Sequence, residues 1–289
     1  MRKWTSLSVA LVCMLMLVLA GCGAGGSNGE SGANGGGASG TPSESPSAEA
    51  PASGLDKIKS RDKLIVGVKY DTKLFGLKNP TTGEVEGFDV DIAKALAKHI
   101  LGDETKVELV EVTSKTRIQM LDNGDIDMIV ATMTITEERK NQVEFSDVYF
   151  KAGQSLLVKK GSPIKGLEDV KKGTKVLAVK GSTSVNNIKE KAPDATVLEF
   201  DNYQDAFSAL KAGQGDTLTT DNAILYGMAA QDSNYEVVGE PFTDEPYGIA
   251  VKKGDTTLAA AVNEGLKAMK EDGSYNKIYE QWIGEPPAE

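Results

Sequence analysis

The sequence has few of the residues used in nucleophilic, redox or metal chemistry. Its 289 residues include two cysteines and one histidine. Two cysteines cannot build a disulfide framework or a multi-cysteine zinc site. A catalytic relay would have to rest on His99, which lies beside the apolar stripe of an expected helix, and this favours a structural role. No expected strand precedes a glycine-rich phosphate loop. We therefore expect no metal, no cofactor and no enzymatic activity.

Positive charge is scarce as well. The chain has 32 basic and 42 acidic residues, which give a formal net charge of −10. Non-specific nucleic-acid binding depends on clustered Lys and Arg, so we expect no nucleic-acid partner. The length indicates one large or two modest domains, and an apolar fraction of 40% is enough for hydrophobic cores.

The N-terminus has the pattern of an export signal. Arg2 and Lys3 precede an apolar run, residues 7–20, that is too short to span a bilayer comfortably. The run ends in Leu-Ala-Gly-Cys at Cys22, which resembles the lipobox of bacterial lipoproteins. This resemblance implies a signal peptide over residues 1–21 and a lipid on Cys22. The alternative is an ordinary secretory signal with a chance cysteine.

The next segment has a linker composition. Of the 32 residues from Gly23 to Gly54, 26 are Gly, Ser, Ala or Pro. Such a stretch cannot bury enough surface to offset its ordering entropy. We interpret residues 22–54 as a flexible, lipid-anchored tether. It would hold the protein at the extracellular face of a bacterial cytoplasmic membrane, through the lipid alone.

The remaining residues alternate between strand and helix patterns. Expected strands are 64–68, 107–112, 126–131, 155–158, 176–179, 196–200, 217–220 and 248–251. Expected helices are 88–100, 115–123, 185–191, 204–212, 223–230, 258–270 and 275–282. This alternation favours an α/β fold with largely parallel sheets.

Polar side chains follow these strands, where the ligand crevice of an open α/β sheet lies. The candidate ligand-binding residues are Lys69, Arg117, Thr132, Thr134, Arg139, Thr183, Tyr203 and Asp221. Thr183 adds backbone N–H groups at a helix start, which suit an anion. Tyr203 either lines the pocket or packs in the core.

Three charged residues carry the local argument. Arg117 and Arg139 are expected in first helical turns, which Ser114 and Thr136 would cap. A cation there opposes the helix dipole at a cost of about 0.3–1 kcal/mol, which favours a role in holding an anion over two exposed salt bridges. Asp221 offers the charge that an ammonium group requires, or else caps the helix that follows it.

Several motifs resemble the extracellular solute-binding proteins, family 3, which serve ABC importers of polar amino acids. They are Gly-Phe-Asp-Val-Asp-Ile-Ala at 87–93, Thr-Ile-Thr-Glu-Glu-Arg-Lys at 134–140, Phe-Ser-Asp-Val-Tyr at 145–149, Val-Lys-Gly-Ser-Thr at 179–183 and Glu-Asp-Gly-Ser-Tyr at 271–275. The resemblance covers about residues 55–284.

The resemblance implies a two-lobe, periplasmic-binding-protein-like fold of type 2, with two hinge-crossing segments. Lobe one would combine residues 55–150 with 246–289, and lobe two would be residues 153–243. In this family, the residues that match Arg139 and Asp221 hold the α-carboxylate and the α-ammonium of an amino acid. Thr134 and Thr183 match hydroxyl and backbone donors, and Thr132 matches a further lining position.

The choice of ligand rests on Lys69 and Arg117, which match neither α-group contact. Two buried cations could neutralise a second carboxylate, so we expect glutamate or aspartate, with glutamine as the alternative. Residues 112–118 and 76–80 also resemble the acidic amino-acid binders of the family. Expected partners are the free amino acid and an ABC permease with its ATPase, and we expect a monomer.

Two other classes of function remain open. An enzyme on this fold, such as a dehydratase relative, would need a general acid or base in the cleft, and carboxylates could serve. A sensor ectodomain or an adhesin is the other class. An adhesin would not depend on the cleft residues.

Overall fold

The structure is a computed structural model, and it describes residues 53–284. The predicted signal peptide, the lipid site Cys22 and the tether up to residue 52 lie outside the described residues. The last two residues assigned to the tether belong to the fold. Ser53 caps helix α1 (Gly54–Arg61) through a capping box with Asp56, so the ordered chain begins there.

The first sheet has the strand order β5-β1-β6-β13-β7. Its strands are β1 (Leu64–Val68), β5 (Val107–Glu111), β6 (Met128–Ile129), β7 (Val143–Ala152) and β13 (Glu245–Lys252). Its helices are α1, α2 (Phe88–Leu101), α3 (Arg117–Asn123), α4 (Glu137–Lys140), α8 (Thr256–Glu271) and α9 (Ser274–Trp282). A small sheet of β2 (Asp71–Thr72), β3 (Gly76–Lys78) and β4 (Val85–Glu86) precedes α2. We call this part lobe one.

The second sheet has the order β10-β9-β11-β8-β12. Its strands are β8 (Gln154–Lys159), β9 (Lys175–Val179), β10 (Thr196–Phe200), β11 (Thr217–Asp221) and β12 (Tyr235–Val238). Its helices are α5 (Thr183–Lys191), α6 (Tyr203–Lys211), α7 (Asn222–Ala229) and a 3-10 turn at Leu167–Asp169. We call this part lobe two. The two-lobe α/β fold expected from the sequence is confirmed.

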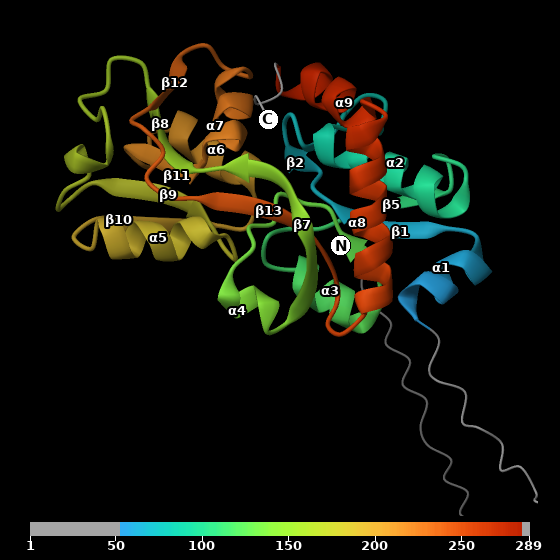
Figure 1. Cartoon of the computed structure of the whole chain (residues 1–289). Helices are drawn as coiled ribbons and strands as arrows, with labels where there is room; N and C mark the ends of the chain where they lie inside the picture. Colours follow the sequence, from blue (N-terminus) through green and yellow to red (C-terminus); the bar gives the residue numbers. More distant parts are fainter. Residues whose placement is uncertain (1–52, 285–289) are drawn as a thin grey trace, which may run out of the picture. The chain divides into compact units, whose positions relative to one another are not determined.

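The chain crosses between the lobes twice, at residues 152–154 and 242–245. Strands β7 and β13 pair antiparallel up to the contact of Ala152 with Glu245, and β8 starts at Gln154 (Figure 1). Gly153 lies where the crossings meet, because a Cβ there would come within 2.6 Å of the Thr243 carbonyl oxygen. Only glycine allows this approach without a backbone shift.

Both sheets are mixed, whereas the sequence pattern predicted largely parallel sheets. Strands β1, β5 and β6 are parallel, but β13 runs antiparallel to β6 and β7. In lobe two, β9, β10 and β11 are parallel, while β8 is antiparallel to β11 and β12. The antiparallel strands include those that carry the chain across, and local periodicity contains no signal for their direction.

The hydrophobic core follows these layers. Aromatic residues meet near the crossings, where the Phe75 ring makes edge contacts with Phe88, Phe150 and Tyr247. The expected strand 126–131 is a strand only at Met128–Ile129. Within residues 53–284, no helix has the length and apolar character that crossing a membrane requires.

Candidate ligand-binding site

Arg139 lies between the lobes. Thr136 caps α4, as predicted, by accepting a hydrogen bond from the Arg139 backbone N–H at 3.2 Å. The Arg139 guanidinium donates from Nη1 to the Thr134 carbonyl at 2.8 Å and from Nη2 to the Gly181 carbonyl at 3.0 Å. The first contact fixes the side chain within lobe one, and the second reaches lobe two.

The backbones of the two lobes touch at Gly181. This residue has φ +77°, and a Cβ there would lie 2.7 Å from the Ser114 carbonyl oxygen and the Lys115 Cα. Both the left-handed conformation and the close approach require glycine. We had predicted that Ser114 caps α3. This prediction is wrong, because the N-cap residue is Thr116. The Ser114 hydroxyl instead accepts from Lys69 Nζ at 2.8 Å.

Lys69 is 0% exposed, and its ammonium lies 5.3 Å from the centre of the Tyr203 ring. Burial lowers the pKa of Lys69 to about 7, although the charge of Asp71 opposes the shift. Tyr203 begins α6, and its backbone N–H donates to Asp71 Oδ2 at 2.7 Å. Its hydroxyl lies 3.2 Å from Thr220 Oγ1. Tyr203 therefore contacts both lobes while its ring remains part of the core.

Arg117 is 2% exposed at the start of α3. Its Nη1 donates to the Ala131 carbonyl at 2.6 Å, and a longer contact of 3.4 Å reaches the Thr132 carbonyl. Burial lowers the pKa of Arg117 to about 9, and the charge of Arg139 acts in the same direction. The exposed salt bridge that was the alternative for Arg117 is excluded by this burial.

Thr132 has a strained backbone with φ +45°, which is uncommon for a residue with a branched side chain. Its N–H donates to Asp89 Oδ2 at 2.9 Å, and Tyr149 donates to Asp89 Oδ1 at 2.8 Å. Burial raises the pKa of Asp89 to about 7. The sequence reasoning missed this role of Asp89, because in the motif at 87–93 it reads only as an acidic residue in the first turn of a helix.

Asp221 ends β11 and precedes α7, but its side chain makes no capping hydrogen bond. Asp221 thus occupies the N-cap position of α7, as the capping alternative expected, but without a side-chain hydrogen bond to the helix. Tyr247 donates its hydroxyl to Asp221 Oδ2 at 2.5 Å. Burial, with the nearby charge of Glu245, raises the pKa of Asp221 to about 7. Tyr247 and Glu245 were not among the predicted residues, since both lie at the second crossing, where no local pattern marks them.

Thr183 begins α5, so its backbone N–H is one of the helix N–H groups without an intrahelical partner. Its hydroxyl accepts from Gln154 Nε2 and donates to Glu245 Oε2, both at 2.9 Å. The hydroxyl is thus engaged by the protein, whereas the family resemblance implied both hydroxyl and backbone donors.

Three buried side-chain atoms have no hydrogen-bond partner within the described residues. They are Arg117 Nε, Thr132 Oγ1 and Asp221 Oδ1. Native proteins leave few such atoms unpaired, and each one calls for an explanation. All three belong to predicted ligand-binding residues, and they offer a cationic donor, a hydroxyl and a carboxylate. A polar, charged small molecule would satisfy this combination.

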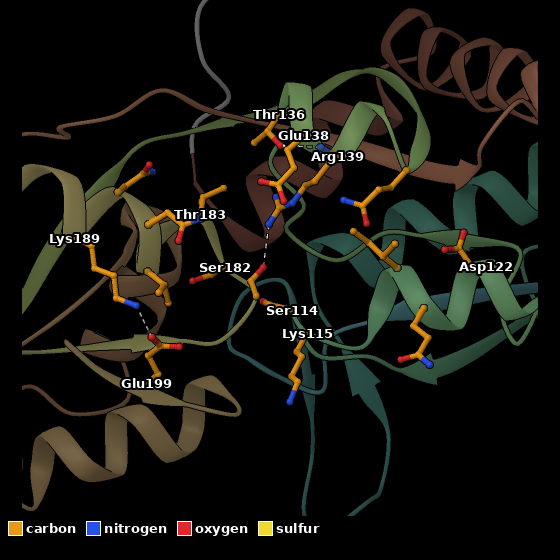
Figure 2. A pocket seen from close by; sticks show the side chains of 17 residues that line it. Ser114, Lys115, Asp122, Thr136, Glu138, Arg139, Ser182, Thr183, Lys189 and Glu199 are labelled. Carbon is orange, nitrogen blue, oxygen red and sulfur yellow. Dashed lines mark hydrogen bonds and ion pairs between the residues drawn. The ribbon is translucent and has the colours of Figure 1, made fainter.

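An open groove of about 800 Å³ is lined by residues of both lobes. Figure 2 shows Arg139 and Glu138 on its lobe-one side, with Thr183 and Lys189 facing them from lobe two. Arg139 and Thr183 are the two predicted site residues that line it. The other six predicted residues, Lys69, Arg117, Thr132, Thr134, Tyr203 and Asp221, are buried outside the groove.

The charges buried in the described part of the chain balance. The buried cations are Lys69, Arg117 and Arg139, and the buried carboxylates are Asp89, Asp221 and Glu245. The argument for an acidic ligand counted the cations alone. With the buried acids included, the site has no spare positive charge when all six groups are ionised.

Residues 64–285 match the bacterial extracellular solute-binding proteins, family 3. The chain belongs to this family. The ABC transporter glutamine-binding protein GlnH of Bacillus subtilis (strain 168) is 68% identical over 243 residues, which is 84% of this chain and 89% of that protein. The glutamate-binding protein GluB of Corynebacterium efficiens is 37% identical, with 77% and 79% covered.

A solved structure agrees with the fold. An ancestral arginine-binding protein bound to glutamine has a TM-score of 0.73 and 47% identity, and the match covers 78% of this chain and 99% of that one. The family and the fold expected from the motifs are therefore confirmed. The sequence reasoning had placed glutamine behind glutamate and aspartate, whereas the relative with 68% identity is named as a glutamine-binding protein.

Proposed function

We propose that this protein captures glutamine between its lobes and delivers it to an ABC importer. The observation that carries the proposal is the pairing of Arg139 and Asp221, a buried guanidinium and a buried carboxylate from opposite lobes. A planar guanidinium suits a two-point contact with the α-carboxylate, and Asp221 Oδ1 is free to accept from an α-ammonium. Every free amino acid carries this pair of charges.

The charge balance of the site supports glutamine over the acidic amino acids. Glutamine has no net charge, so it would leave three buried cations against three buried carboxylates. Glutamate would add one negative charge without a spare cation, and burying an unpaired charge is costly. The name and the 68% identity of the Bacillus subtilis relative point in the same direction.

The decisive experiment is a thermal-shift panel of the twenty amino acids on ligand-stripped protein. A ligand that binds only the folded form raises its stability by RT ln(1 + [L]/Kd), so the largest shift identifies the tightest binder. We expect glutamine to give that shift, with glutamate and aspartate well behind. A largest shift with glutamate would restore the acidic alternative, and no shift with any amino acid would refute the proposal.

Closure of the lobes around the ligand is part of the proposal. We take lobe one as residues 55–150 with 246–289 and lobe two as residues 153–243, hinged at the two crossings. The contacts from Arg139 to Gly181 and from Tyr203 to Asp71 support a closed arrangement as one stable state. Small-angle scattering should show a smaller radius of gyration with saturating glutamine. An unchanged radius would contradict the hinge.

We propose binding without chemical conversion, in association with a permease and its ATPase. The names of the relatives, which are binding proteins, support this reading. Incubation of the protein with amino and keto acids, followed by product analysis, should reveal no turnover. A measurable product would favour the enzyme alternative.

The membrane anchor is a separate proposal, which rests on the lipobox-like sequence before Cys22. Cys22→Ala should move the protein from the membrane fraction to the medium without changing the affinity for glutamine. Retention of the variant on the membrane would contradict the anchor and leave the binding proposal intact.

A further inference from the structure

A buried polar cluster joins both crossings to the start of α5. Glu245 is the first residue of β13, is 2% exposed, and accepts from Thr183 Oγ1 and from Asn187 Nδ2, each at 2.9 Å. Gln154, the first residue of β8, donates to Thr183 Oγ1 at 2.9 Å and accepts from Asn187 Nδ2 at 3.1 Å. Thr183 and Asn187 lie four residues apart, on one face of the helix.

The cluster determines what Thr183 can offer to a ligand. Its hydroxyl has one proton, which goes to Glu245, and it also accepts from Gln154. The hydroxyl therefore has no proton left for a ligand carboxylate. The backbone N–H of Thr183 stays available at the helix N-terminus, where the helix dipole favours an anion.

Arg139 holds the same segment from the other lobe, through its contact with the Gly181 carbonyl. The chain from Gly181 to Thr183 is thus fixed between Arg139 and Glu245. Both are buried, and they carry opposite charges. A ligand carboxylate held by Arg139 would lie next to the N–H of Thr183 only if α5 keeps this position.

We propose that Glu245 is a positioning residue, which locks the first turn of α5 so that Thr183 binds the ligand through its N–H rather than its hydroxyl. The part that concerns the ligand rests on the proposed function. The lock itself does not, because its contacts lie entirely within the protein. Glu245 lies at the second crossing, so its side chain connects the hinge to the first turn of α5.

The ligand-independent test is hydrogen exchange on the ligand-free protein. Glu245→Gln replaces one of the two acceptor oxygens by a donor, so Thr183 or Asn187 loses its partner. We expect faster exchange of the amides at 186–189, the first in α5 that have intrahelical hydrogen-bond partners, while those of α6 stay unchanged. Glu236→Gln, on the edge strand β12, is the matched control and should alter neither helix. Unchanged exchange in α5, or an equal increase in both helices, would overturn the lock.

The binding test is a double-mutant cycle measured by calorimetry with glutamine. Glu245→Gln and Thr183→Val should each weaken binding by roughly 5- to 100-fold, the usual cost of an unpaired buried group. The double variant should be no weaker than the weaker single variant, because both changes break one contact. Thr183→Ser, which keeps the hydroxyl, should bind more tightly than Thr183→Val.

Multiplying losses in the double variant would mean that the Thr183 hydroxyl contacts the ligand directly, and the inference would be wrong. If the wild-type protein binds no amino acid, the proposed function fails, yet the exchange experiment still decides whether Glu245 positions α5. The two failures are therefore distinguishable.

Discussion

The two ends of the candidate site use charge differently. At one end, Arg139 from lobe one and Asp221 from lobe two have opposite signs, and each keeps capacity for a ligand. At the other end, Lys69 and Arg117 both belong to lobe one and donate to neutral oxygens of Ser114 and Ala131. In the function that we propose, the first end binds the α-groups shared by all amino acids. In the same proposal, the second end distinguishes the ligand side chains.

Because of this difference, the argument that two buried cations indicate an acidic ligand has to be corrected. Asp71 and Asp89 face Lys69, and their charges oppose the fall in its pKa. The cations of the second end are therefore partly compensated by the protein. A buried cation indicates an anionic ligand only after the buried acids around it have been counted.

The largest effects should come from the α-group end. Asp221→Asn keeps the shape and a partner for Tyr247 but removes the charge, and Arg139→Met keeps the length of the chain. Each should weaken glutamine, glutamate and aspartate alike, by roughly 30- to several-thousand-fold, the usual cost of truncating a buried ion pair. Calorimetric titration of the three ligands measures this. A variant that loses only one of them would show that the two ends are wrongly assigned.

The α-group end shows how much of the site could be predicted from the sequence. Thr134 follows β6 and Asp221 ends β11, and the carboxyl ends of strands line the ligand crevice of an open α/β sheet, so a place at that crevice was predictable for both. The partner of Asp221 was not, because Tyr247 lies 26 residues further along, on the returning crossing. Which side chains pair across a hinge depends on the antiparallel return of β13, and no local period encodes that return.

The end formed by Lys69 and Arg117 shows a second limit of prediction from the sequence. The sequence correctly placed Lys69 directly after a strand and Arg117 in the first turn of a helix. The prediction of Ser114 as the cap of that helix was wrong, because its hydroxyl binds Lys69 instead. A serine before a helix has several possible partners, and only the tertiary structure selects one. The burial of Asp89 was invisible for the same reason, since a charge next to an apolar residue reads as surface until the packing is known.

The pH dependence should also test the α-group end. An α-ammonium needs Asp221 ionised, and the pKa of Asp221 is raised to about 7, chiefly by burial. Protons therefore compete with the ligand below pH 7, and the affinity should fall by up to about tenfold per pH unit between 7 and 5. Calorimetry with glutamine at pH 8, 7, 6 and 5 measures this.

The ligand-free protein should respond with the opposite sign. A carboxyl whose pKa is raised on folding binds protons more tightly in the folded state, so Asp221 and Asp89 should add stability as the pH falls from 7 towards 4. Melting temperatures without ligand should show this, and Asp221→Asn should reduce the slope. Affinity that stays constant down to pH 5 would mean that Asp221 does not hold the ammonium.

The smallest effect should come from the side-chain end, and it tests the choice of ligand. Arg117→Met removes one buried cation, so two buried cations would remain with three buried carboxylates. Glutamate should then lose more affinity than glutamine, because a hydrogen bond to a charged acceptor contributes about 1.5–3 kcal/mol and one to a neutral acceptor about 0.5–1.5. The ratio of the two dissociation constants should change roughly 5- to 10-fold.

Arg61→Met, at the partly exposed end of α1, is the matched control and should change neither affinity. An unchanged ratio with Arg117→Met would mean that Arg117 only supports the loop at Ala131. Selection of the side chain would then have to come from Lys69 and the residues around it.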